Sequence, residues 1–261
     1  MLKSGLVSVT LRQLTAEKII KLMQKSGLEL IEWGGDIHVP HGDIAVAKKI
    51  KQQSRENGIG ICSYGSYYRT AESEKEGLAF ETVLDTAEAL GAPVIRVWAG
   101  NIGSADADAG YRNRVIEDSR RICELAAERK IKVAYEYHKE TLTDTNLSAA
   151  ELLRQVDHAN LYTYWQPPNK MDEDYCAKGL QTILPRLTVI HAFQWRFSNG
   201  HGERRPLQEG EERWLRFLDI ANQSNTELPV LIEFVRNDDP EQFLRDAEAL
   251  KSWLHTLNQG H

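Results

Sequence analysis

Residues 132–137 read KVAYEY and stand between two stretches of helical character. The stretch before them runs from about Asp108 to Arg129, so that only two residues separate it from the run. The helix after them is expected to open with the capping box Ser148-Ala-Ala-Glu151, which satisfies free backbone N–H groups at a helix start. A short β-rich run between two helices is one unit of the alternation that builds a parallel sheet.

The same alternation continues from this run to both ends of the 261-residue chain. Eight such runs are expected to be strands: Gly5–Thr10, Leu28–Trp33, 59–65, Val94–Ala99, Lys132–Tyr137, Leu161–Gln166, Leu187–Phe193 and Pro229–Val235. Eight units favour a closed (β/α)₈ TIM barrel, a fold of about 250 residues. The first run is not followed by the GxGxxG of an open dinucleotide-binding sheet. We therefore predict a single TIM-barrel domain over residues 1–261.

Composition excludes several classes of partner. The net charge is −6 and no run of Lys or Arg forms a patch, which argues against nucleic acid and against an anionic membrane surface. The three cysteines are far apart and form no CxxC motif, so we expect reduced thiols. No segment approaches the roughly 20 apolar residues of a membrane span, and the first residues lack a signal-peptide pattern. The expected location is the cytoplasm.

Connection lengths indicate which end of the barrel is functional. Several strand-to-helix loops are long, at residues 64–73, 100–107 and 196–210, whereas the helix-to-strand connections are short. Long loops at the carboxyl ends of the strands form the catalytic face of TIM barrels. We expect the site there.

Charged and polar residues interrupt otherwise apolar strands near these carboxyl ends. They are Glu32, Glu136, His138, Gln166, His191 and Glu233. A buried ionisable group is costly unless it is paired or bound to a metal. Each one considered separately is equally well explained as a hydrogen-bonded interior group. Two glutamates and a histidine at the mouths of three strands instead indicate a shared site for one divalent metal ion, Mn²⁺, Mg²⁺, Co²⁺ or Zn²⁺.

Five segments carry a resemblance to a known family. They are LELIEWGGDIHVPHGD (28–43), VAYEYHKETLTDT (133–145), LYTYWQPPN (161–169), LTVIHAFQWR (187–196) and VLIEFV (230–235). On these the whole chain resembles the xylose isomerase-like TIM barrels, which include sugar isomerases, ketose 3-epimerases and the endonuclease IV type of repair enzyme. The resemblance implies that one metal ion is held by Glu136, Gln166, His191 and Glu233.

The second of these positions departs from the family, which usually has aspartate where this chain has Gln166. An amide oxygen can bind a metal, but through a dipole instead of a full charge, so affinity should fall and the ion should be a stronger Lewis acid. Two alternatives are that the site has lost its metal and that Gln166 only contacts substrate. The three-zinc arrangement of the repair enzymes needs further histidines, and Trp98 stands where one would be required.

The predicted chemistry is proton transfer next to a carbonyl. An α-hydroxy ketone would bind the metal through two oxygens, and Glu136 and Glu233 would act as the acid–base pair of a sugar isomerase or epimerase that works through an enediolate. One alternative is a dehydratase or lyase on a cyclic polyol ketone, which shares the first step. Another is a sugar-binding barrel that has lost its metal and has no catalytic activity.

Further residues are expected to contact the sugar or hydroxy-ketone substrate. They are Trp33, His38, Tyr67, His138, Asn169 and Arg196. Trp33 offers a flat apolar surface to a sugar ring, and Asn169 stands where the family tends to have a substrate-contacting histidine. For His138 and Arg196, a structural histidine and a solvated loop arginine are equally good interpretations. Relatives commonly form dimers or tetramers, so a homodimer or homotetramer is possible.

Overall fold

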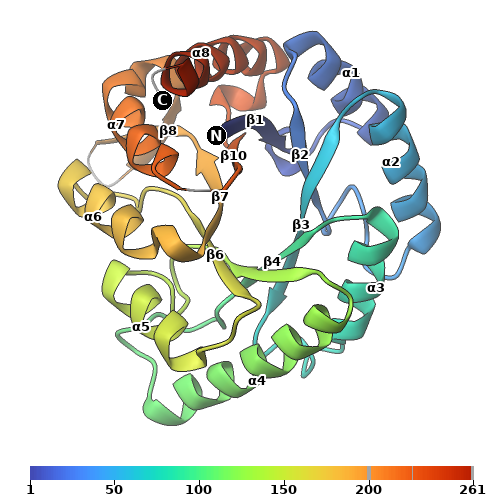
Figure 1. Cartoon of the computed structure of the whole chain (residues 1–261), viewed down its shortest axis with the longest axis vertical. Helices are drawn as coiled ribbons and strands as arrows, with labels where there is room; N and C mark the ends of the chain where they lie inside the picture. The colour runs from blue at the N-terminus through green and yellow to red at the C-terminus, as the bar shows by residue number, and fades with distance from the viewer. Residues whose placement is uncertain (199–200, 225, 260–261) are drawn as a thin grey trace.

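Eight parallel strands form a closed barrel in the described part of the chain, in the order β1-β10-β7-β6-β5-β4-β3-β2 (Figure 1). The structure is a computed structural model that describes residues 1–198, 201–224 and 226–259. The barrel strands are β1 (Leu2–Val7), β2 (Leu30–Gly34), β3 (Gly60–Arg69), β4 (Val94–Trp98), β5 (Lys132–Tyr135), β6 (Leu161–Trp165), β7 (Leu187–Ala192) and β10 (Leu228–Ile232). The predicted TIM barrel is confirmed.

The helices form the outer ring of the barrel (Figure 1). They are α1 (Ala16–Ser26), α2 (Ile44–Glu56), α3 (Phe80–Leu90), α4 (Ala109–Glu128), α5 (Asn146–Val156), α6 (Glu173–Ile183), α7 (Glu211–Asn222) and α8 (Pro240–Gln259). The start of α5 differs from the prediction. Thr145 is the N-cap and accepts from the backbone N of Ser148 at 3.1 Å, so the helix begins before the expected capping box.

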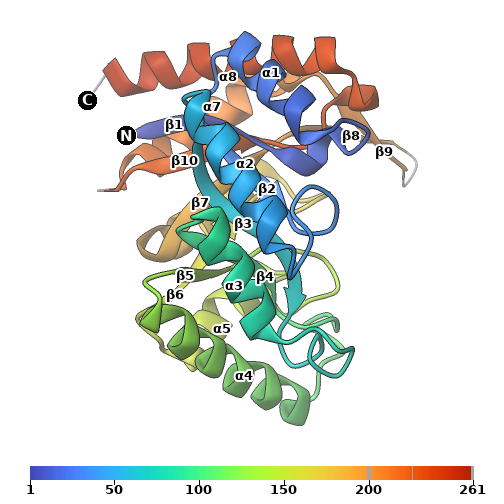
Figure 2. The ribbon, with the colours of Figure 1, turned by 90° about the vertical axis from the view of Figure 1, so that its right-hand side faces the viewer.

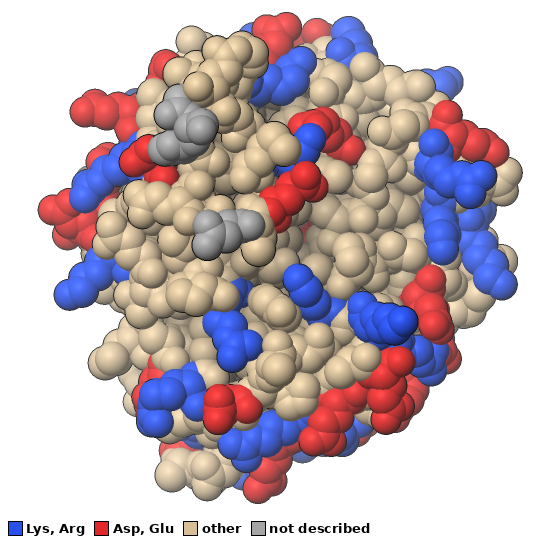
Figure 3. All heavy atoms as spheres, viewed as in Figure 1, with Lys and Arg blue, Asp and Glu red and all other residues tan. Residues whose placement is uncertain are grey.

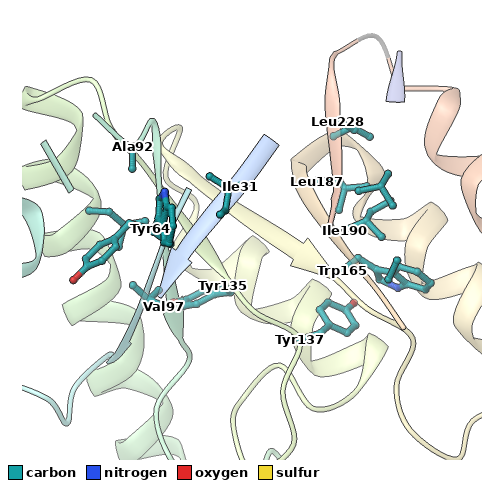
Figure 4. Close-up of a cluster of buried hydrophobic side chains, with 14 of the residues drawn as sticks. Ile31, Tyr64, Ala92, Val97, Tyr135, Tyr137, Trp165, Leu187, Ile190 and Leu228 are labelled. Atoms are coloured by element: carbon teal, nitrogen blue, oxygen red, sulfur yellow. The ribbon is translucent and has the colours of Figure 1, made fainter. Parts of the chain in front are cut away.

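Side chains alternate along each strand between the helices and the barrel interior. Outward-facing residues pack against the helices in one large apolar cluster, part of which is shown in Figure 4, including Ile31, Tyr135 and Ile190. A smaller apolar cluster fills the interior itself. Its buried members are Val7, Val9, Cys62, Val94, Ala134, Tyr164, Val189 and Leu231.

The predicted loop at 196–210 is largely ordered structure. Strand β8 (Gln194–Ser198) pairs antiparallel with β9 (His201–Arg205), while residues 199–200 lie outside the described part. Figure 2 shows this hairpin at the opposite end of the barrel from both termini. The predicted loop at 64–73 is also shorter, because β3 continues to Arg69.

The surface carries charges of both signs. On the face seen in Figure 3, acidic and basic side chains are mixed around the edge. None of the helices in the described residues is both long enough and apolar enough to cross a membrane.

Candidate functional site at the carboxyl ends of the strands

A cavity of about 780 Å³ opens at the carboxyl ends of the barrel strands. Its floor includes Arg96, Glu136 and Glu233. Its walls come from the segments after β1, β5, β6 and β10, from Tyr67 on β3 and Trp98 on β4, and from the β8–β9 hairpin. The cavity therefore lies at the end of the barrel that the loop lengths indicate.

Glu136, His191 and Glu233 meet beneath this cavity. One potential ligand atom from each lies within 4.8 Å of those from the other two, and all three residues are buried. Nδ1 of His191 is 3.7 Å from Oε1 of Glu136 and 3.5 Å from Oε2 of Glu233. The structure thus brings together three of the four residues expected to bind a metal.

The barrel ladder places both glutamates. Each directly follows the last residue of its strand, and its backbone N–H still donates to the neighbouring strand. Glu136 N donates to Val97 O at 3.0 Å, and Glu233 N donates to Ala192 O at 2.9 Å. Two residues earlier on the same strands, Ala134 and Leu231 belong to the interior apolar cluster. The period of two therefore turns both carboxylates inward.

Gln166 lines the same cavity from the end of β6. Its Nε2 donates to Tyr137 O at 2.6 Å, which fixes the orientation of the amide. Its Oε1 is buried and has no hydrogen-bond partner. The oxygen, which is the atom able to bind a cation, is therefore the free one.

Arg96 belongs to this site but is absent from the residues predicted for it from the sequence. It is buried on β4 between two carboxylates, with Nη1 paired to Oε2 of Glu136 and Nε 3.1 Å from Oε1 of Glu32. Trp98 Nε1 also donates to Glu136 Oε2, at 2.5 Å. In the sequence, Arg96 can be recognised as a charged residue inside the apolar run VIRVW.

Gly65 makes room for this network, because a Cβ there would lie 2.7 Å from both Arg96 Nη2 and Glu32 Oε1.

The network changes how these groups ionise. Burial alone would raise the pKa of Glu136, but the charge of Arg96 and the hydrogen bond and charge of His191 together outweigh it and hold this pKa well below its ordinary value. Arg96, His191 and Ser63 together outweigh burial in the same way and lower the pKa of Glu32. For His191, burial opposes a charge, but Glu233 and then Glu136 outweigh it and raise the pKa of the imidazole.

Tyr67 and Phe234 line the cavity in strained backbone conformations, with φ of 57° and 55°. Aromatic residues rarely adopt positive φ, and such strain concentrates at functional sites. The Tyr67 hydroxyl accepts from Arg12 Nη2 at 3.0 Å, and its ring lies 4.6 Å from the Arg96 guanidinium carbon. Burial raises the pKa of Tyr67.

His138 and Asn169 also line the cavity, as Tyr67 does. The His138 ring stacks on Trp98, with centroids 4.3 Å apart and planes at 21°. Its Nδ1 is 2.7 Å from Lys139 O. A carbonyl can only accept, so Nδ1 carries the hydrogen and Nε2 of the neutral ring is bare.

Three residues predicted to contact substrate lie elsewhere. Trp33 is fully buried and its Nε1 donates to Ser54 on α2, because it follows inward-facing Glu32 by one residue and so faces outward. His38 is buried with its ring nitrogens 3.0 Å from Ser8 Oγ and 3.1 Å from Leu14 O. Arg196 is exposed on the hairpin and pairs with Glu203 at 2.8 Å, outside the residues that line the cavity.

The residues present fit a divalent cation. The buried atoms without a hydrogen-bond partner include four that can bind a cation here: Nδ1 and Nε2 of His191, Oε1 of Gln166 and Oε2 of Glu233. Unsatisfied buried polar atoms are rare and call for an explanation. The composition of the site agrees, since three buried carboxyl groups (Glu32, Glu136, Glu233) face one buried guanidinium (Arg96).

Comparison with known proteins places the chain in a family. It belongs to the xylose isomerase-like TIM barrels, whose family model matches residues 20–253. A stretch of 67 residues is 48% identical to a 3-dehydroshikimate dehydratase of Bacillus anthracis, covering 26% of this chain and only 24% of that protein.

Solved structures share the fold over nearly the whole chain. The probable 3-DHS dehydratase AsbF of B. anthracis, involved in petrobactin synthesis, has a TM-score of 0.75 at 22% identity and covers 96% of this chain and 98% of its own. A D-psicose 3-epimerase of Clostridium cellulolyticum H10, solved with D-tagatose, has a TM-score of 0.73 at 20% identity, covering 98% and 99%. At these identities the likeness establishes the fold and not the reaction.

Proposed function

We propose that this chain is a divalent-cation-dependent dehydratase that eliminates water from a cyclic polyol ketone. The first step is still the proton abstraction next to a carbonyl that the sequence predicts. The second step is the elimination of water, given above as the alternative, in place of isomerisation. The stretch shared with the B. anthracis 3-dehydroshikimate dehydratase supports this choice.

The observation that carries the proposal is the unequal environment of the two glutamates. Epimerisation needs an acid–base group on each face of the reacting carbon. Glu136 is poorly suited to be one of them, because Arg96 and Trp98 occupy its Oε2 and Arg96 lowers its pKa. Glu233 keeps a buried oxygen without a partner. We therefore revise the expected acid–base pair and assign Glu136 to holding the cation.

Four atoms would hold that cation: Glu136 Oε1, Gln166 Oε1, His191 Nδ1 and a carboxylate oxygen of Glu233. When bound, a divalent ion supplies Lewis-acid polarisation of the substrate carbonyl, which makes the neighbouring C–H group more acidic.

His138 is the base in this proposal. Its bare Nε2 can take the proton next to the carbonyl, while the Nδ1–H bond to Lys139 O and the stacking on Trp98 hold the ring in place. The C–H electron pair forms a C=C bond as the neighbouring C–O bond breaks. The leaving hydroxyl takes a proton from Tyr67 and departs as water, and solvent returns the proton from His138 to Tyr67.

Tyr67 is suited to that second role. Arg12 donates to its oxygen, so the phenolic hydrogen is available to another group. Burial raises its pKa, so the phenol stays protonated near neutral pH. Aromatic rings of Trp98, Phe193, Trp195 and Phe234 line the cavity, which suits the flat faces of a ring-shaped substrate.

A direct comparison of substrates tests the proposal. The Mn²⁺-loaded protein is incubated in deuterated water with 3-dehydroshikimate and, separately, with D-psicose, and both reactions are followed by NMR and ultraviolet absorbance. We expect loss of water from the cyclic ketone and no change in D-psicose. Deuterium in an inverted D-psicose, with 3-dehydroshikimate untouched, would instead establish an epimerase. Binding without turnover of either compound would favour the sugar-binding alternative.

Replacement of the base gives a second test. His138→Gln should lower kcat by about 10²- to 10⁴-fold, the usual contribution of general acid–base catalysis. His255→Gln, on the exposed side of α8, is the matched control and should keep wild-type kcat. Wild-type turnover in the His138 variant would remove it from the reaction.

A further inference from the structure

Glu32, in the middle of β2, lies on the far side of His191 from the glutamates of the cation site. It is fully buried, and its Oε2 is 3.8 Å from His191 Nε2. Glu136 and Glu233 lie instead beside Nδ1, at 3.7 and 3.5 Å. The two nitrogens of one imidazole therefore face different carboxylates.

This division assigns the nitrogens different roles. A neutral imidazole has one bare nitrogen, which can bind a cation, and one that carries hydrogen. Nδ1 faces the two carboxylates that would share a cation with it, so Nδ1 is the bare nitrogen. The Nε2 hydrogen then needs an acceptor inside a fully buried site. Among the charged groups of the described residues, Glu32 is the one within 4 Å of Nε2.

Glu32 itself is held in place from two sides. Ser63 Oγ donates to Glu32 Oε2, the same oxygen that faces His191, at 2.8 Å. Arg96 Nε lies 3.1 Å from the other oxygen. Tyr164 packs edge-on against the imidazole, with ring centroids 5.1 Å apart, which limits how far His191 can turn. A fixed carboxylate beside a confined imidazole is suited to orienting it.

We propose that Glu32 is a positioning residue, which accepts the Nε2 hydrogen of His191 and thereby fixes the tautomer whose Nδ1 binds the divalent cation. The inference rests on the cation site of the proposed function. The present 3.8 Å separation is about 1 Å longer than a hydrogen bond, so a small rotation of the imidazole on cation binding is part of it. Metal-ligating histidines commonly donate their second N–H to a carboxylate in this manner.

Metal affinity and tautomer are measured together. Mn²⁺ binding by titration calorimetry should weaken by about 10- to 100-fold in Glu32→Gln. Asp246→Asn, which neutralises another buried carboxylate, is the matched control and should bind Mn²⁺ as wild type does. Asp246 bonds to Leu207 N and Gln242 and is not among the residues that line the cavity. In the Zn²⁺-loaded wild type, ¹⁵N NMR of His191 should show a coordinated Nδ1 and a protonated Nε2.

A loss of charge near the site weakens cation binding even without any effect on the tautomer, so the NMR result decides the role. Coordination through Nε2, or Mn²⁺ affinity in Glu32→Gln equal to wild type, overturns the inference and leaves the proposed dehydratase intact. No Mn²⁺ or Zn²⁺ binding by the wild-type chain overturns the cation site, and the inference with it.

Ser63→Ala covers the case in which Glu32→Gln does not fold. It keeps every charge and removes only the hydroxyl that fixes Glu32 Oε2. We expect a loss of Mn²⁺ affinity of about two- to tenfold, the usual contribution of one hydrogen bond, together with a mixture of Nδ1 and Nε2 coordination in the ¹⁵N NMR of the Zn²⁺-loaded variant. Unchanged affinity, or coordination through Nδ1 alone, contradicts the inference.

Discussion

The barrel interior has two layers that differ sharply although the same strands build both. The first is the apolar cluster that includes Ala134, Val189 and Leu231. The second follows two residues later on each strand, with Glu136, His191 and Glu233, a step of about 7 Å along the strand. Apolar burial in the first layer stabilises the fold, whereas buried ionic groups in the second contribute little or oppose it. The residues that stabilise the fold and the residues of the candidate site are therefore separated along the barrel axis.

The largest expected effect of a single change falls in the charged layer. Glu233→Gln removes a carboxylate from the cation site and should lower kcat by about 10²-fold or more, because Lewis-acid polarisation by a bound cation contributes several kcal/mol. Thermal unfolding should keep its midpoint or move slightly upward, because a neutral amide costs less to bury. Steady-state kinetics and calorimetry check this pair of results. Full activity would show that the second layer is structural.

The converse change falls in the apolar layer. Leu231→Ala leaves a cavity at a fully buried position and should lower the free energy of unfolding by about 2–5 kcal/mol. Urea denaturation measures the loss, and kcat measured well below the melting temperature should stay close to wild type. A large fall in kcat without a loss of stability would break the separation of the two layers.

Gln166→Asp sharpens the description of the charged layer. It restores the carboxylate that the family usually has and adds a negative charge to the site. Mn²⁺ should therefore bind about tenfold more tightly, which is a fraction of what one added charge can give when it is in contact with the ion. Calorimetric titration against wild type measures this. Equal affinities would mean that Gln166 does not bind the cation.

The smallest effect concerns the cysteines. Burial raises the pKa of Cys62, in the apolar layer, and of Cys123, in the outer cluster, to about 12. The thiolate is the reactive form, so the folded protein should react with a thiol-specific reagent very slowly at pH 8, and faster as the pH rises toward 12. In denaturant all three cysteines should react at once. Rapid labelling of Cys62 in the folded protein would mean that water enters the apolar layer.

Much of this arrangement follows from sequence alone. Strand–helix alternation gives the barrel, and a lone glutamate or histidine in an apolar run indicates an inward position at a strand end, as for Glu136, His191 and Glu233. Arg96 carries the same signal in VIRVW. Its role depends on Glu32 and Glu136, however, which are adjacent only once the barrel closes.

The remaining differences also have physical causes. Trp33 was expected in the cavity because it ends a strand, but the period of two places its neighbour Glu32 inside and Trp33 outside. Arg196 was expected in a loop, but cross-strand pairing in the hairpin gives it Glu203 as a partner. In both cases the partner across space, and not the position along the chain, decides where the side chain lies.

Gly65 limits how this barrel can be redesigned. A single methyl group at that position would press on Arg96 and Glu32 at once, and neither side chain can move away without breaking the buried ion pairs. Anyone who reshapes the pocket for a new substrate can vary those rim residues that have no part in catalysis or cation binding, but residue 65 has to stay without a side chain for as long as the ionic network is retained.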